Sequence, residues 1–286
     1  MSRLGINKTY KLYIGGKFPR TESGRYYTVN DSKGNLIANM CLASRKDFRN
    51  AVVSARKSQV PWSNISALNK GQILYRIAEM LEGRKEQFIT ELVEQGETKI
   101  NAKTEVELSI DRLVYYAGWS DKYQQLFSAV NPVSGTYFNF SSVEPVGVIA
   151  IIAPENPSLL GLISVVAPAI VGGNTVIVLA SESQPMTSIS FAEVINSSDV
   201  PAGVINILTG HKEELISHMA SHMDVNAMVY CGKEDDDIKS ISELASNNVK
   251  RTFFYKKKDW ANKQCQSPYF IEKTLEVKTT WHPTSV

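Results

Sequence analysis

The sequence predicts an α/β protein built on a doubly wound parallel sheet, with a helical region before the sheet and a separate β arm. Three observations support this fold class. Helical periodicity dominates the first half, apolar β-branched runs alternate with helical stretches from Val146 onward, and two further β-prone segments lie outside this alternation. Strands that are buried on both faces and separated by helices are typical of a parallel, doubly wound sheet.

The first half begins with a turn and continues with helices. Gly15-Gly16 separates two short β-prone segments, which predicts a hairpin turn. Ser44 and Asp47 have the spacing of a capping box, and we expect the helix that they start to end at Pro61-Trp62. Two shorter amphipathic helices follow, and a longer helix is expected from about Thr104 to Leu126.

The second half alternates strands with helices. The expected strands are Val146–Ile152, Thr175–Leu179, Val204–Leu208, Ala227–Tyr230 and Arg251–Phe254. The expected helices between them are Leu159–Ala169, Thr187–Ile195, Glu213–Ser221 and Asp237–Asn247. Each unit of this series has the length of a strand and a crossover helix, so all five strands are expected to share one parallel sheet.

Two β-prone segments do not fit the alternation. Thr136–Val143 alternates residue types as an exposed strand does, and Leu275–Trp281 lies well after the last strand of the series. A single strand is not stable by itself and has to pair with another. The candidates for Leu275–Trp281 are the Thr136–Val143 strand and the sheet of another subunit.

The composition is that of an ordinary globular protein. Of 286 residues, 43% are hydrophobic and 21% are charged, and the formal net charge is +2. Such a balance gives no reason to expect a nucleic acid or an anionic membrane as partner. The most apolar stretch, residues 146–179, is interrupted by prolines and glycines, whereas a membrane-spanning helix needs about 20 continuous apolar residues.

Cysteine usage and the N-terminus indicate a cytoplasmic protein. Three cysteines lie far apart in the sequence, which predicts neither a disulfide framework nor a zinc site. The first residues lack the apolar core and cleavage site of a secretory signal. His218 and His222 are four residues apart and share a helix face, but no third metal ligand accompanies them, so no metal is expected.

Several motifs resemble those of the NAD(P)-dependent aldehyde dehydrogenases. They occur in the order and spacing of that family between Lys11 and Asp259. The motifs are Tyr115–Lys122 (YYAGWSDK), Glu144–Val148 (EPVGV), Ala167–Ala169 (APA), Gly173–Val176 (GNTV) and Pro201–Val204 (PAGV), followed by Asn206 and Thr209-Gly210. The resemblance implies a Rossmann-like sheet whose carboxyl edge holds the cofactor in the family.

After Asp259 the resemblance skips a large part of the family pattern. Members of the family continue into a catalytic domain that holds the nucleophilic cysteine, and they end in a strand that joins another subunit's sheet. Here Leu275–Thr280 resembles that last strand, while the catalytic domain has no counterpart before it. The organisation is similar to the degenerate second half of the family-sixteen aldehyde dehydrogenases. The similarity includes the final motif of an aromatic residue, any residue and a proline, here Trp281–Pro283.

This resemblance divides the chain into five expected parts. They are a helical part of the cofactor unit (residues 1–130), an oligomerisation strand segment (131–145), a Rossmann-like core (146–259), a linker in place of the catalytic domain (260–274) and a C-terminal oligomerisation strand (275–286).

The resemblance leaves little catalytic chemistry in the chain. Asn156 matches the family's oxyanion-stabilising asparagine, but the neighbouring Glu155 would place a negative charge beside it. Tyr255 stands at the position of the general-base glutamate, and a phenol has an ordinary pKa of about 10. Cys265 lacks the surroundings of the nucleophile. We therefore expect no catalytic residue, with Asn156 as a remnant only.

The cofactor-binding positions are also altered. Glu182, Gly210 and Gly232 match family residues near the cofactor, and these three are the candidate remnants of its site. Leu179 replaces the lysine that binds the ribose. Residues 234–237 place four carboxylates at a helix start, where the family's pyrophosphate would need positive potential. No cofactor is therefore expected, and weak NAD(P) binding is the alternative.

Together these features predict a pseudoenzyme that serves as an oligomerisation, structural or regulatory subunit. Its expected partners are itself, as a homo-oligomer, and a full-length aldehyde dehydrogenase. Two alternatives stay open. The chain could be a subunit that binds NAD(P) and receives its catalytic cysteine from a partner, or a sensor that binds a nucleotide or metabolite in the remnant crevice.

Overall fold

A five-stranded parallel sheet forms the centre of the molecule, for which a computed structural model describes residues 8–284. The strand order is β10-β9-β6-β7-β8, and every neighbouring pair is parallel. The strands are β6 (Val148–Ile152), β7 (Thr175–Leu179), β8 (Ile205–Leu208), β9 (Ala227–Tyr230) and β10 (Arg251–Phe254). The predicted α/β fold class is confirmed.

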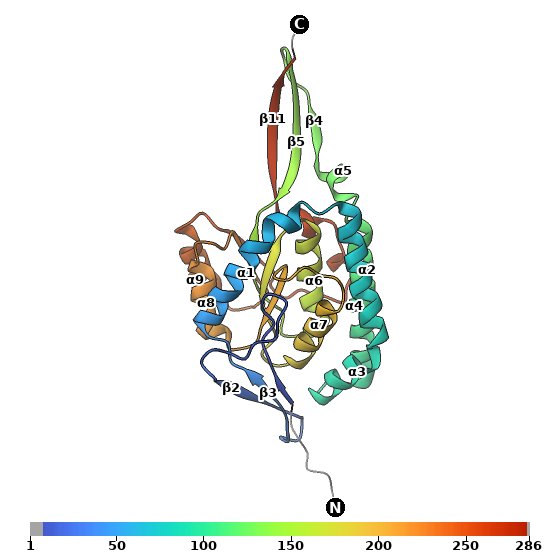
Figure 1. Cartoon of the computed structure of the whole chain (residues 1–286), viewed down its shortest axis with the longest axis vertical. Coiled ribbons are helices and arrows are strands. Elements are labelled where there is room, and N and C mark those ends of the chain that lie inside the picture. Colours follow the sequence, from blue (N-terminus) through green and yellow to red (C-terminus); the bar gives the residue numbers. More distant parts are fainter. Residues whose placement is uncertain (1–7, 285–286) are drawn as a thin grey trace, which may run out of the picture.

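Helices cover both faces of this sheet (Figure 1). Ile149 and Ile151 of β6 belong to one apolar cluster, whereas Ala150 and Ile152 belong to another, because successive side chains of a strand point to opposite faces. The helices on the first face are α6 (Ser158–Val171) and α7 (Met186–Asn196); those on the second are α1 (Arg45–Ser63), α8 (Lys212–Ser221) and α9 (Asp235–Ser246). Double coverage explains why β6 to β9 are fully buried.

A further helical layer packs outside α6 and α7. It consists of α2 (Ala67–Gly83), α3 (Lys85–Glu94) and α4 (Lys99–Trp119), and the short helix α5 (Tyr123–Phe127) follows in contact with β5 and α10. The long helix expected from Thr104 to Leu126 is therefore two helices, and its first part starts earlier because Thr98 caps it by accepting from Asn101 N at 3.2 Å. At the break, Ser120 Oγ donates to the Ala117 carbonyl at 2.8 Å.

The end of α1 differs from the prediction. The helix continues past Pro61 to Ser63, because Trp62 is buried and its indole N–H donates to the Ile170 carbonyl of α6 at 2.9 Å. This contact holds the last turn of α1 in helical geometry against α6. The predicted start is confirmed, since Ser44 and Asp47 form a capping box.

A small sheet precedes α1. Its strands are β1 (Lys8–Tyr10), β2 (Tyr26–Asn30) and β3 (Leu36–Cys41), in the order β1-β3-β2. Between β1 and β2 lies the predicted turn, in which Ile14 and Lys17 exchange backbone hydrogen bonds of 3.0 and 3.1 Å. Gly15 and Gly16 have φ of 60° and 72°, values that only glycine adopts without strain.

An antiparallel arm projects from the body of the molecule (Figure 1). It is formed by β4 (Ala129–Asn131), β5 (Tyr137–Pro145) and β11 (Leu275–Pro283), in the order β11-β5-β4. The register of β11 on β5 runs without a break from Leu275 opposite Pro145 to Pro283 opposite Tyr137. Of the two pairing candidates for the late strand, the pairing within this chain is thus observed.

Candidate functional site

The carboxyl ends of β6 and β9 open onto a crevice of about 210 Å³. Ligands of open α/β sheets bind at this edge. Two of the four residues predicted for the site, Asn156 and Gly232, line the crevice. The other two, Glu182 and Gly210, lie outside its lining, so the structure does not gather the four predicted residues around one cavity.

Asn156 follows β6 in the loop that leads into α6. Its side-chain amide donates one hydrogen bond to Oε1 of Glu97 at 2.9 Å, which leaves the second N–H of the amide for another acceptor. Glu155 does not stand free beside this amide, as the sequence suggested. Its Oε2 instead accepts hydrogen bonds from the backbone N–H groups of Glu182 and Ser183 at 3.0 and 3.1 Å. Glu155 therefore holds the loop after β7 to the loop after β6.

The Glu182 carboxylate is engaged in a similar way. One oxygen accepts the backbone N–H of Lys212 at the start of α8, and the other lies 3.2 Å from Nδ1 of His211. A carboxylate at a helix N-terminus stabilises the unpaired N–H groups there. Gly210 precedes this contact, and a Cβ added to it would lie 3.2 Å from the backbone nitrogen of Ala43. Both residues thus fix the β8–α8 loop in the present structure.

Gly232 lies in the loop between β9 and α9, where a tyrosine occupies the adjoining space. A Cβ at position 232 would come within 2.2 Å of the Tyr230 hydroxyl oxygen, so a larger residue does not fit. The Tyr230 hydroxyl is 2.7 Å from Oε2 of Glu234 and 2.5 Å from Oδ2 of Asp237. Lys212 Nζ lies 3.0 Å and 3.4 Å from the same two carboxylates. We call these four residues, Tyr230, Glu234, Asp237 and Lys212, the Tyr230 cluster.

The cluster has a distinct protonation pattern. The hydrogen bond from Tyr230, followed by that from Lys212, lowers the pKa of Glu234 to about 2. Burial and the two carboxylates raise the pKa of Tyr230 far above its ordinary value, so the phenol stays protonated. Partial burial opposes ionisation of Lys212, but its contacts with Glu234 and Asp237 raise its pKa overall. With one cation and two carboxylates, the cluster carries net negative charge.

Two further positions at which the sequence departs from the family pattern, Leu179 and Tyr255, lie outside the lining of the crevice. Leu179 ends β7 with a fully buried, apolar side chain. Tyr255 is buried as well, with its ring in edge contact with Trp260 at 5.8 Å between centroids. Burial raises the pKa of Tyr255 further above that of an ordinary phenol, so it offers no base near neutral pH. Lys257 and Lys258 line the crevice beside Trp260.

The segment after β10 is packed onto the body by one buried arginine. Arg112 of α4 donates to Ser164 Oγ at 2.6 Å, to the Cys265 carbonyl at 2.7 Å and to the Trp260 carbonyl at 2.9 Å. The same segment contains the short helices η1 (Lys263–Cys265) and α10 (Tyr269–Glu272) before β11 begins. Residues 255–274 are thus an ordered connection between the central sheet and the arm.

None of the three cysteines has the character of a nucleophile. All are free thiols, and the sulfur chemistry of a nucleophile requires the thiolate. Burial raises the pKa of both Cys231 and Cys265. Cys41 is buried at the end of β3. A protonated, enclosed thiol attacks a carbonyl poorly at neutral pH.

The crevice is lined by side chains of both charges. Lys212 and Glu234 of the Tyr230 cluster line it together with Glu155, Lys233, Lys257 and Lys258. The two carboxylates of the cluster at the start of α9 oppose an anion there, whereas the three lysines outside the cluster favour one. The volume of about 210 Å³ is below the range of about 300–1,000 Å³ that is usual for sites of organic ligands.

Sequence reasoning missed three residues that define the site. The hydrogen-bond partners that join Arg112 to the Trp260 and Cys265 carbonyls lie about 150 residues away in the sequence, so no local signal marked them. Tyr230 gave a clearer signal, since it ends a buried strand directly before the acidic run. A phenol at that place could have been recognised as a hydrogen-bond donor to the carboxylates.

Two further properties concern the whole described part of the chain. Within residues 8–284, no group of three or more His, Cys, Asp or Glu side chains is arranged to hold a metal ion. No helix in that range combines the length and apolar character needed to cross a membrane.

Comparison with known proteins identifies the relatives of this chain. The model of the aldehyde dehydrogenase family matches residues 18–254, which end at the last residue of β10. The chain is 32% identical over 257 residues to the cytosolic 10-formyltetrahydrofolate dehydrogenase of Mus musculus, covering 88% of this chain and 28% of that protein. It is 33% identical over 252 residues to the putative aldehyde dehydrogenase DhaS of Bacillus subtilis, covering 86% and 50%.

The fold has close counterparts among solved structures. The crystal structure of PnpE from Pseudomonas sp. WBC-3 superposes with a TM-score of 0.82 at 26% identity, over 86% of this chain and 50% of PnpE. PnpE has also been solved in complex with nicotinamide adenine dinucleotide. This chain belongs to the aldehyde dehydrogenase family. It spans between about a quarter and a half of the length of the relatives that it matches.

Proposed function

We propose that this chain is a non-catalytic, oligomer-forming member of the aldehyde dehydrogenase family. In this proposal it assembles with itself, with a full-length aldehyde dehydrogenase, or with both. One observation carries the proposal: the arm is complete, although only residues 255–274 separate its last strand from the central sheet. In this proposal the chain therefore keeps the arm, which offers a strand to a partner. It lacks the catalytic domain that the family pattern places between the central sheet and the last strand.

The surface of the arm supports a role in assembly. Large apolar side chains are exposed on it, with exposed fractions of 65% for Val277, 58% for Trp281 and 69% for Val130. Tyr137 and Phe138 near the tip are each 47% exposed. The outer edge of β11 pairs with no strand among residues 8–284. A free edge beside exposed apolar groups favours pairing with another chain.

The crevice supports the non-catalytic part of the proposal. The Asn156 amide, which lines the crevice, is hydrogen-bonded to Glu97. The Tyr230 cluster lies beside the crevice at the start of α9. The buried phenol Tyr255 supplies no general base, and burial raises the pKa of the Cys231 and Cys265 thiols. Aldehyde oxidation requires a nucleophile, a base and a hydride acceptor to act together.

The test compares assembly of the wild type with that of an arm variant. Light scattering coupled to gel filtration gives the mass of the wild type and of Val277→Lys/Trp281→Lys, which places charges on the exposed face of β11. The expected result is an oligomer for the wild type and a monomer for the variant. The matched control is Val53→Lys/Leu68→Lys, since these two side chains are 64% and 67% exposed on α1 and α2. A wild type that is monomeric at every concentration and copurifies with no relative contradicts the proposal.

An alternative function is a subunit that binds NAD(P) and receives its cysteine from a partner. It differs from our proposal in requiring the crevice to accept the cofactor, which a binding assay decides. We further propose a reducing, cytoplasmic location, which is supported by the three free cysteines. A sensor that binds a nucleotide or metabolite in the crevice is the remaining candidate.

A further inference from the structure

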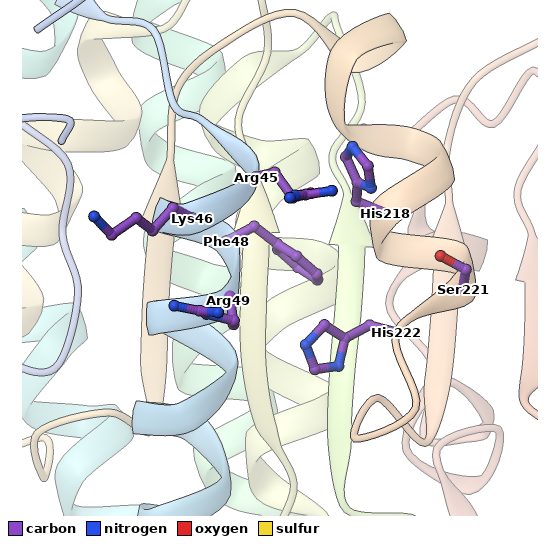
Figure 2. Close-up of a pocket in the computed structure, with 7 residues that line it drawn as sticks. All are labelled: Arg45, Lys46, Phe48, Arg49, His218, Ser221 and His222. Carbon is purple, nitrogen blue, oxygen red and sulfur yellow. The ribbon is translucent and has the colours of Figure 1, made fainter. Parts of the chain in front are cut away.

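A second pocket lies between α1 and α8, away from the crevice at the strand ends. It has a volume of about 330 Å³ and is formed by the first two turns of α1 and the last turn of α8. Figure 2 shows Arg45 extending from α1 toward His218 of α8, while Lys46 extends away from both. No carboxylate is among the side chains that line it.

The arginines of this pocket are unusual in having no partner. Arg45 and Arg49 make no hydrogen bond or ion pair with any of the residues 8–284, and the same is true of Arg20. Every other arginine in that range contacts an acceptor, as Arg25 contacts Glu214 at 2.7 Å. Both arginines are exposed and line one cavity, and Arg45 extends toward its far side. A guanidinium group can donate two parallel hydrogen bonds to an oxyanion.

The surrounding groups strengthen this preference for an anion. The acid in the first turn of α1, Asp47, points elsewhere, since its carboxylate accepts from Thr21 Oγ1 at 2.6 Å and from the Ser44 backbone N–H at 2.9 Å. The positive end of the α1 dipole lies at the same place. At the end of α8, Lys250 Nζ donates to the carbonyls of Ala220 and His222 at 2.6 and 3.0 Å. These acceptors are therefore already in use.

The two histidines add donors rather than acceptors. His222 Nδ1 accepts the backbone N–H of Asp224 at 3.2 Å, so the neutral ring carries its proton on Nε2. Burial lowers the pKa of His222, and Lys250 and Arg49 lower it further, against the opposing effect of Asp224. The ring of buried Phe48 packs edge-on against it at 5.7 Å and gives the cavity one apolar wall.

We propose that this pocket binds the phosphoryl group of a small phosphomonoester. The guanidinium groups of Arg45 and Arg49 hold the phosphate oxygens, and His218 and His222 donate to the same group. The apolar wall at Phe48 contacts the organic part of the ligand. A phosphate dianion has more oxygens than a carboxylate and carries two charges, so it can accept from more of these donors than a carboxylate can.

The test follows the four histidine side chains by proton NMR while inorganic phosphate or glycerol phosphate is added at constant ionic strength. The chain has four histidines, so each ring proton can be resolved and assigned with His218→Gln and His222→Gln variants. The expected result is a saturable shift of the His218 and His222 signals, with those of His211 and His282 unchanged. Acetate at equal ionic strength serves as the carboxylate probe and is expected to bind at least about tenfold more weakly.

A variant establishes which residues are responsible. Arg45→Gln/Arg49→Gln is expected to weaken phosphate binding by about tenfold or more, because two charge-assisted contacts are lost. Arg20→Gln is the matched control, since it removes an arginine that also lacks a partner, and it is expected to leave the affinity unchanged. Unchanged thermal unfolding of both variants confirms that they fold.

Three results overturn the proposal: histidine signals that do not move, equal affinity in Arg45→Gln/Arg49→Gln, or equal binding of acetate and phosphate. None of them bears on whether the arm forms oligomers.

Discussion

The hydroxyl oxygen of Tyr230 lies 2.7 Å from Oε2 of Glu234, which itself lines the crevice at the carboxyl ends of β6 and β9. The contact joins the end of β9 to the residue that precedes α9. Glu234 also forms an ion pair with Lys212, so the acidic start of α9 is part of the Tyr230 cluster. The chain thus uses this edge of the sheet to stabilise its own fold.

The first prediction concerns the stability that this contact provides. Tyr230→Phe removes the donor and is expected to lower the free energy of unfolding at pH 7 by about 1 kcal/mol, a small value because Glu234 is half exposed. The pKa of Glu234 should rise from about 2 toward its ordinary value. Urea unfolding and a carboxyl NMR titration measure the two effects.

The sign of the pH dependence follows from the lowered pKa of Glu234. A depressed carboxyl pKa stabilises the fold above the ordinary value of about 4.5, and this contribution is lost as the pH falls toward 2. The difference between wild type and Tyr230→Phe should therefore be constant near neutrality and shrink in that acid range. Tyr75→Phe, at an exposed tyrosine of α2, is the control. A difference that grows on acidification would count against the assignment.

A second prediction concerns the lysine that the family uses for its cofactor. Leu179→Lys is expected not to restore NAD⁺ binding, because the carboxylates of the Tyr230 cluster still oppose the pyrophosphate. The buried charge should also destabilise the protein, since Leu179 is 1% exposed. Calorimetric titration with NAD⁺ checks the first point, with Leu179→Met as the control. Measurable NAD⁺ binding by Leu179→Lys would favour the alternative of a cofactor-binding subunit.

A third prediction concerns the connection between sheet and arm. Arg112→Met removes the donors to Trp260 and Cys265 and leaves buried carbonyls without partners, so we expect a loss of about 3 kcal/mol or more. The freed segment contains Lys257, Lys258 and Lys263, and trypsin should cut there much faster than in the wild type. Arg76→Met, at an exposed arginine of α2, controls for loss of charge. Equal cleavage rates in both variants would show that Arg112 does not hold the segment.

A fourth prediction concerns Glu105, which accepts the backbone N–H groups of Leu159 and Leu160 at 2.7 and 3.2 Å. Burial raises the pKa of Glu105 to about 7. A raised carboxyl pKa means that the folded state binds the proton more tightly, so stability falls as the pH rises from about 4.5 through 7. The loss from this group is on the order of 3 kcal/mol.

Glu105→Gln removes this titration while keeping a carbonyl acceptor for the start of α6. Its unfolding free energy should therefore depend less on pH between 5 and 8 than that of the wild type, as measured by urea unfolding at several pH values. Glu79→Gln, at an exposed residue of α2, is the control. Parallel pH profiles for wild type and Glu105→Gln would refute the role of this carboxyl.

The sequence was most informative where one local pattern decides the structure. Three strands were predicted with the bounds observed, namely Thr175–Leu179, Ala227–Tyr230 and Arg251–Phe254. A short run of this kind between two helices is compatible with few structures other than a strand of a parallel sheet. The small sheet formed by β1, β2 and β3 was not predicted, since its strands are short and largely exposed. The end of α1 was misplaced because a distant contact with α6 outweighs the local effect of Pro61.

The candidate sites depend on contacts that no local pattern encodes. The acidic run at residues 234–237 was visible, but its pairing with Lys212 depends on how β8 and β9 are ordered in the sheet. His218 and His222 were recognised as a pair on one helix face. Their neighbours Arg45 and Arg49 come from a helix far away in the sequence, so the pocket that these residues line together could not be recognised from the sequence.

The most direct test of the central claim is native mass spectrometry of the protein purified from its own source. Our account predicts an assembly that contains at least two copies of this chain, or this chain together with a full-length aldehyde dehydrogenase. A single unassociated copy at every concentration measured would contradict it.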